Sequence, residues 1–94
     1  MTKTTNITRA QVFCLRRIWS DTRYLLRGDR KHALEVRYFM RKRADVRDRS
    51  IPVLFRLGLV EFVSEPREST TYYAVRITVK GNEIRRQYQD MDLK

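Results

Sequence analysis

The sequence predicts an α+β domain in which three helices precede a two-stranded hairpin and a fourth helix. Up to Gly58, apolar residues recur every three or four positions, as in amphipathic helices. Beyond Gly58, two segments alternate and are rich in β-branched and aromatic residues. No repeat or low-complexity stretch interrupts this pattern, so we expect one domain over residues 8–90, with polar tails at 1–7 and 91–94.

The first helix is predicted to begin at Thr8 and to continue to about Tyr24. Thr8 and Gln11 have the spacing of a capping box, in which each side chain bonds to the backbone of the other residue. Cys14 lies on the apolar stripe of this helix, and this position predicts a buried, unreactive thiol.

A second helix is predicted over about 30–41. Asp29 follows a glycine and can cap this helix. Apolar residues then recur at mostly three- and four-residue spacing, which is the period of a helix: Ala33, Val36, Tyr38, Phe39 and Met40.

The third helix is predicted over about 46–57, with Asp45 as its N-cap and Gly58 at its end. Pro52 complicates this prediction, because a proline inside a helix removes a backbone donor. Either the helix is distorted near Pro52, which we favour, or a short helix begins at Ser50 with Pro52 in its first turn.

Two strands are predicted over 59–63 and 72–77, and the polar linker between them suits the loop of an antiparallel hairpin. Thr78 can then cap a fourth helix, which carries a thin apolar stripe.

Charge is the strongest indication of function. The chain has 21 Lys and Arg against 11 Asp and Glu, a net charge of +10. Residues 1–56 hold 15 basic and 5 acidic residues, whereas residues 57–94 hold 6 of each. The whole excess therefore lies in the first part of the chain, and a polyanionic partner is the leading hypothesis.

Several other classes of protein find little support. His32 has no Cys or second His at ligand spacing, and neither a phosphate loop nor a nucleophile motif is present, so we expect no metal, cofactor or enzymatic activity. No apolar run approaches the roughly 18 residues of a membrane span, and no secretory signal is evident. With its single cysteine, the chain is expected to be cytoplasmic.

Two motifs, taken with the order of the elements, resemble a known family. Residues 54–60, Leu-Phe-Arg-Leu-Gly-Leu-Val, are similar to the junction between recognition helix and wing in winged helix-turn-helix DNA-binding domains. Residues 77–81, Ile-Thr-Val-Lys-Gly, resemble the start of the helix after the wing in MarR-like and PadR-like transcription regulators. The resemblance covers roughly residues 8–90 and implies a three-helix helix-turn-helix core, a β-hairpin wing and a C-terminal helix.

The resemblance implies a small transcription regulator that binds specific sites on double-stranded DNA with its third helix in the major groove. The base contacts would come from Arg47, Asp48 and Arg49, since Arg can bind guanine with two hydrogen bonds. The expected phosphate contacts are Arg30, Lys31, Arg41, Lys42, Arg43, Arg56 and Arg67.

The family also suggests a homodimer through the last helix, with Ile84, Tyr88 and Met91 at the contact. The main alternative function is a winged-helix module that binds a protein and modulates a transcription or replication complex. An RNA-binding module is a minor option because its usual motifs are missing. Trp19 and the tyrosines are expected in the core rather than stacked on bases.

Overall fold

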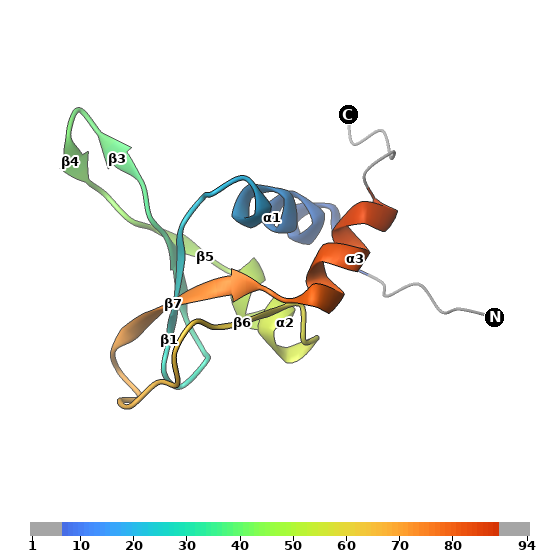
Figure 1. Ribbon diagram of the computed structural model, residues 1–94. Helices are drawn as coiled ribbons and strands as arrows, with labels where there is room; N and C mark the ends of the chain where they lie inside the picture. Colours follow the sequence, from blue (N-terminus) through green and yellow to red (C-terminus); the bar gives the residue numbers. More distant parts are fainter. Residues whose placement is uncertain (1–6, 89–94) are drawn as a thin grey trace.

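The computed structural model describes residues 7–88, which form three helices, a five-stranded antiparallel sheet and a separate two-stranded hairpin (Figure 1). The elements, in chain order, are α1 (Arg9–Trp19), β1 (Tyr24–Arg27), β2 (Ala33–Glu35), β3 (Tyr38–Phe39), β4 (Lys42–Arg43), β5 (Val46–Asp48), α2 (Ser50–Arg56), β6 (Val60–Phe62), β7 (Tyr72–Ile77) and α3 (Val79–Gln87). The strand order in the sheet is β5-β2-β1-β7-β6, and the β3–β4 hairpin projects away from the helices. The predicted α+β class is confirmed.

The core lies between one face of the sheet and the three helices. In β1, Tyr24 and Leu26 are buried and the intervening Leu25 is not, as the period of two in a strand requires. Leu15 of α1 and Leu54 of α2 are also fully buried, and they belong to the same apolar cluster as the sheet residues. Burial of this single cluster therefore holds the helices against the sheet.

Helix α1 begins as predicted and ends early. Thr8 Oγ1 accepts a hydrogen bond from Gln11 N at 3.2 Å, and Gln11 Oε1 accepts one from Thr8 N at 2.9 Å, so the capping box is confirmed. The predicted end at Tyr24 is wrong, because the helix stops at Trp19 and Tyr24 begins β1. Cys14 is buried, and burial raises the pKa of its thiol to about 12.

The predicted second helix over about 30–41 is wrong. This part of the chain contains the strands β2 and β3 instead. In β2, Ala33 and Glu35 face the core and Leu34 does not. Because one of the two inward positions is a charged residue, hydrophobicity does not alternate along β2, and its apolar neighbours match a helical period by coincidence.

The third helix is shorter than predicted. Residues 46–48 form strand β5, which pairs with β2, and helix α2 covers only Ser50–Arg56. Pro52 lies in the first turn, where a backbone N–H would have no partner within the helix. The alternative of a short helix from Ser50 is therefore confirmed. Asp45 does not cap a helix; its carboxylate instead accepts hydrogen bonds from Arg43.

Without the second helix, the described residues do not form the expected three-helix core ahead of the hairpin. One helix, five strands and a short second helix precede β6. Strand β1 pairs with β7, and β7 with β6, so the predicted hairpin is part of the larger sheet.

The hairpin and the last helix are as predicted. Thr78 Oγ1 accepts from Gly81 N at 2.9 Å and so caps α3. A Cβ atom on Gly81 would lie 2.0 Å from the carbonyl oxygen of Leu59, so only glycine allows α3 to approach the start of β6 this closely. Gly58, with φ of 76°, ends the turn after α2 in the left-handed conformation. The glycines of both motifs therefore have structural roles.

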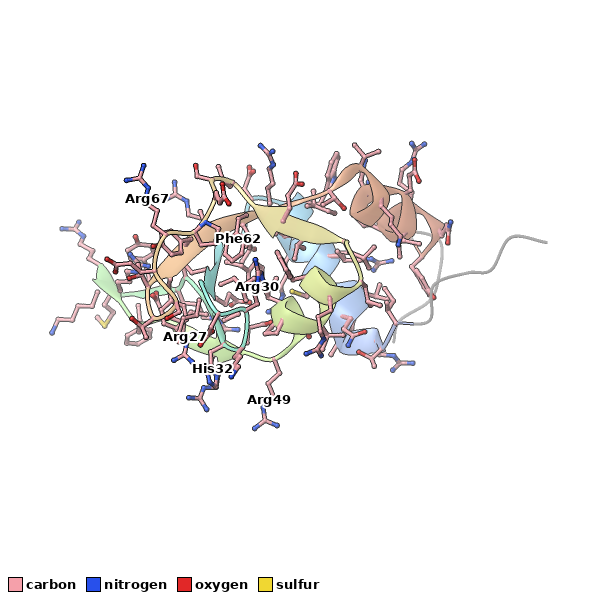
Figure 2. All side chains as sticks on the ribbon, turned by 90° about the horizontal axis from the view of Figure 1, so that it is seen from below. Arg27, Arg30, His32, Arg49, Phe62 and Arg67 are labelled. Atoms are coloured by element: carbon pink, nitrogen blue, oxygen red, sulfur yellow. The ribbon has the colours of Figure 1, made fainter. Side chains whose placement is uncertain are left out.

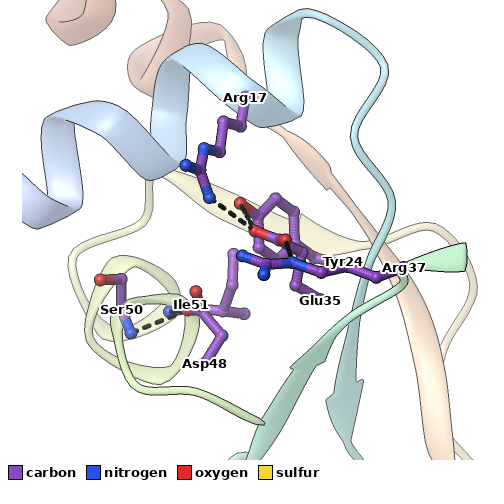
Figure 3. Close-up of polar contacts among 7 residues, drawn as sticks. All are labelled: Arg17, Tyr24, Glu35, Arg37, Asp48, Ser50 and Ile51. Atoms are coloured by element: carbon purple, nitrogen blue, oxygen red, sulfur yellow. Dashed lines mark hydrogen bonds and ion pairs between the residues drawn. The ribbon is translucent and has the colours of Figure 1, made fainter. Parts of the chain in front are cut away.

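Glu35 is the one charged side chain that is buried in the described core, with 6% of its surface exposed. Its carboxylate accepts hydrogen bonds from Tyr24 Oη at 2.8 Å, from Arg17 Nη1 at 3.0 Å and from Arg37 Nε (Figure 3). Burial alone raises the pKa of this carboxyl, but the three donors outweigh burial and hold the pKa below its ordinary value.

We expect this network to make stability depend on pH. Because the pKa of Glu35 is lower in the folded protein than in the unfolded chain, its stabilisation is complete above the unfolded pKa of about 4.3 and is lost as pH falls through the folded pKa. Glu35→Gln should cost about 1–3 kcal/mol at pH 7. Urea unfolding of both proteins at pH 7 and at acid pH measures this, and the variant should lose less stability on acidification. Equal losses would contradict the assignment.

Candidate functional site

A groove of about 300 Å³ runs between the turn that precedes β2, the strand β5 and helix α2. Five of its lining residues are Lys, Arg or His. They come from separate parts of the chain, and we call this surface the basic groove: Lys31, His32, Arg47, Arg49 and Arg56. The remaining lining residues are Ala33, Asp48, Pro52 and Val53.

The turn that carries Lys31 and His32 is held by Asp29. Its Oδ2 accepts from Arg27 Nη2 at 2.5 Å, and its Oδ1 accepts from the backbone N of Lys31 at 3.0 Å. These donors, the Arg27 guanidinium first, lower the pKa of Asp29 to about 2, so the carboxylate is charged at neutral pH. The turn is also bonded to the β6–β7 loop, because Gly28 N donates to Thr71 O at 2.9 Å.

Asp48 is the one carboxylate among the residues that line the groove, and it accepts hydrogen bonds from the start of α2. Its Oδ1 accepts from Ser50 N at 2.8 Å and from Ile51 N at 3.0 Å, two donors that have no partner within the helix (Figure 3). Arg49 occupies the N-cap position and makes no capping bond with its side chain. Asp48 therefore stabilises the start of α2 and leaves the exposed Arg49 side chain available to a ligand.

Arg49 and His32 extend from the same side of the molecule, toward the lower edge of the view in Figure 2. Arg56 lies at the other end of α2 and is exposed. Arg30 lies beside this surface, with its guanidinium carbon 5.4 Å from the centre of the Phe55 ring. This cation–π contact orients the Arg30 side chain along α2.

Ion pairing distinguishes the groove cations from five arginines elsewhere in the described residues. Within residues 7–88, five arginines form ion pairs with carboxylates: Arg17, Arg27, Arg37, Arg43 and Arg76. Over the same residues, no ion pair engages the Lys or Arg side chains of the groove. The groove therefore carries a net positive charge, from three arginines and one lysine against Asp48.

A larger hollow of about 700 Å³ lies between the end of α1, the β3–β4 hairpin and β7. Two of its cations are compensated, because Arg43 bonds to Asp45 and Arg76 bonds to Glu61. Asp21 adds a negative charge to its lining. The smaller basic groove is therefore the better candidate for an anionic ligand.

The structure brings most of the sequence-predicted contact residues together and separates the others. Arg47, Asp48, Arg49, Lys31 and Arg56 all line the groove, with Arg30 beside it. The remaining predicted phosphate contacts lie elsewhere: Arg41, Lys42 and Arg43 in the β3–β4 hairpin, and Arg67 in the loop after β6. In Figure 2, Arg67 extends from the side opposite to His32 and Arg49.

Sequence reasoning missed two features of this surface. The sequence assigns His32 no role because it has no ligand partner at metal-binding spacing, yet it lies among the cations of the groove. Tyr38, Phe39 and Met40 were assigned to the face of a helix, yet they are exposed at the end of a hairpin. The adjacent Arg41-Lys42-Arg43 run could have indicated a hairpin here, because an apolar run beside a charged run is compatible with a hairpin tip as well as with a helix.

Packing within the chain's own core leaves little of the predicted dimer contact exposed. Ile84 is only 6% exposed because it belongs to the core of its own chain. Tyr88 is half-buried against the same core, and Met91 lies outside the described residues. Dimerisation through the last helix therefore stays a hypothesis, and Ile84 contributes to the fold.

Comparison of the chain with protein-family models, curated proteins and solved structures gave no match. Among residues 7–88, no helix has the length and apolar character that crossing a membrane requires. The same residues contain no group of three or more His, Cys, Asp or Glu side chains placed to bind a metal ion.

The capping role of Asp48 is testable by substitution. Asp48→Ala removes the acceptor for two backbone donors and should lower the free energy of unfolding by about 1 kcal/mol. Asp48→Asn keeps the Oδ1 acceptor and should change stability by no more than a few tenths. Urea unfolding of the three proteins separates these cases, and equal stability of all three would argue against the capping role.

Proposed function

We propose that this protein binds double-stranded DNA through the basic groove and acts as a small transcription regulator that occupies a site. The observation that carries the proposal is the cluster of three arginines and one lysine around a single groove, with no compensating ion pair among the described residues. A phosphate backbone is the natural partner of such a surface, since each neutralised phosphate releases a bound counterion.

The geometry of α2 supports a role for base reading. Arg49, Val53 and Arg56 are spaced four and three residues apart, which places them on one side of the helix, and all three line the groove. Helix α2, like any α-helix, is about 10–12 Å across with its side chains and fits a major groove about 12 Å wide. In this arrangement Arg49 and Arg56 would reach base edges or phosphates, and Lys31 would contact the backbone.

We further infer that the fold is a modified winged helix. Strands β1, β7 and β6 are neighbours in the sheet, α1 precedes them, and α2 comes directly before the β6–β7 hairpin. The departure lies between β1 and α2, where the strands β2 to β5 replace the expected helix. The position of α2 ahead of the hairpin supports its comparison with a recognition helix.

Salt dependence is the first test. Four phosphate contacts give a slope of about −3.6 for log K against log salt, so affinity for random duplex should fall roughly 150-fold between 50 and 200 mM salt. Arg56→Ala should reduce the fall to roughly 40-fold. Fluorescence anisotropy measures both, with Arg67→Ala as the control that removes the same charge from the opposite side.

If Arg67→Ala reduces the slope as much as Arg56→Ala does, binding is not localised to the groove. A flat, weak response of the wild-type protein would overturn DNA binding altogether. The protein-interaction alternative would then be the better hypothesis.

Base reading is tested at Arg49. Once preferred sites have been selected from a random pool, Arg49→Ala should remove about 1–3 kcal/mol of the preference for them. Arg49→Lys keeps the charge without the planar fork, so it should preserve the salt slope and still lose most of the preference. A Lys variant that retains full preference would show that Arg49 contacts phosphate.

A further inference from the structure

The tip of the β3–β4 hairpin exposes three consecutive large side chains. Tyr38, Phe39 and Met40 are 66%, 71% and 82% exposed, and the hairpin stands clear of the helices (Figure 1). Large apolar side chains are usually buried, and a contiguous exposed group of them commonly marks a site of interaction.

The two-residue loop at the tip does not require apolar residues. Met40 and Arg41 have φ of 48° and 71°, which identifies a hairpin turn that favours Asn-Gly over bulky residues. Phe39 pairs with Lys42, and Tyr38 pairs with Arg43, so the tip is held in a defined register. This sequence therefore carries Met and Arg at positions where the backbone favours neither.

Two ion pairs lie at the base of the hairpin, each between residues two positions apart in the sequence. Arg37 is bonded to the buried Glu35, and Arg43 Nε donates to Asp45 Oδ1 at 2.9 Å. One backbone hydrogen bond crosses the base of the hairpin, where Ala44 N donates to Arg37 O at 2.8 Å. These bonds therefore order the chain at the point where the hairpin leaves the sheet.

The cations at the tip differ from Arg37 and Arg43 because they form no ion pair among the described residues. Arg41 and Lys42 are both exposed, and no ion pair within residues 7–88 engages either of them. Because paired residues of two strands share a face, Lys42 lies on the same face of the hairpin as Phe39. The tip therefore combines an apolar wedge with free positive charge.

We propose that this tip enters the minor groove of duplex DNA, where Phe39 and Met40 insert between adjacent base pairs and Arg41 and Lys42 contact the flanking phosphates. Apolar wedges of this kind partly unstack a base step and kink the duplex. The inference rests on the proposed function, because the basic groove would bind the same duplex.

The position of the tip suits this role. Strand β5 carries the groove residue Arg47 and pairs with β2, and the hairpin lies between these two strands in the chain. Met40 and Arg47 are seven residues apart along extended chain, so the tip lies within about 23 Å of the groove. This is less than one turn of B-DNA, which is about 34 Å. A duplex of one turn is therefore long enough to span the distance between the two surfaces.

Charge complementarity favours an anionic occupant, and we take it to be duplex DNA because the basic groove would bind the same duplex. An apolar protein partner would leave Arg41 and Lys42 without compensation, whereas phosphates lie on both sides of every base step. An anionic lipid surface and single-stranded DNA also offer negative charge, so both serve as comparison ligands in the test.

The test uses a duplex of about 30 base pairs that contains several TA steps, which kink easily. Fluorophores at its two ends report bending by energy transfer, and permanganate oxidation reports unstacked thymines. Wild-type protein should increase both signals. The double variant Phe39→Ala, Met40→Ala should abolish both, lower affinity about tenfold and leave the salt slope unchanged.

Matched variants control for indirect effects. Val79→Ala removes an apolar side chain that is 79% exposed on α3, and it should leave bending and unstacking unchanged. Phe39→Leu keeps a wedge-shaped apolar side chain and should retain both signals. Circular dichroism should show the same fold in every variant, because the substituted side chains are exposed.

The outcomes distinguish the two proposals. Salt-dependent duplex binding without bending, or bending that survives in the double variant, would overturn the wedge and leave the groove proposal standing. If the tip residues instead govern binding to single strands or to vesicles with anionic lipid, insertion into duplex is wrong. Absence of duplex binding by wild-type protein would overturn both proposals.

Discussion

The buried carboxylate of Glu35 is the constraint on which the arrangement of the chain depends. A charged group is accepted in the interior only where donors replace the lost water, and here Arg17, Tyr24 and Arg37 do so. These donors join α1, β1 and the base of the β3–β4 hairpin at one point. A shift of β2 by one residue would turn Leu34 inward and leave Arg17 and Tyr24 without their acceptor. Glu35 therefore specifies the register of β2 and, through Arg37, braces the hairpin.

The same principle divides the positive charge of the protein into two groups. The arginines that bond to carboxylates hold strands, turns and helices together, and their fields are largely compensated. The cations of the basic groove and of the hairpin tip lack such partners among the described residues, and under the proposals above they contact DNA.

The structure shows which sequence signals were sufficient. The N-terminal ends of α1 and α3 were predictable because the hydroxyls of Thr8 and Thr78 accept hydrogen bonds from backbone N–H groups only three residues away. Strands β6 and β7 were predictable from their alternation. The segment 30–48 was not, because the inward position 35 holds a charged residue and hides the period of its strand. Its second helix was therefore a wrong prediction.

Several residues of the candidate site lie together although the fold around them differs from the prediction. Arg47 and Arg49 were assigned to a helix face, and they lie in the groove although one belongs to a strand and the other caps a helix. Their closeness in sequence keeps them near each other in either structure. The hairpin tip was missed because its exposure depends on Tyr38 and Phe39 forming strand β3 rather than the side of a helix.

The sequence by itself determined the net charge and its concentration before residue 57, the capped starts of two helices, and the reversal at Gly58. Only the tertiary structure decided that β2 to β5 are strands and that Lys31 lies beside Arg56. The reason is the range of the interactions. Caps and turns are completed within a few residues, whereas a strand needs partners far along the chain, and a groove needs the elements that those partners bring together.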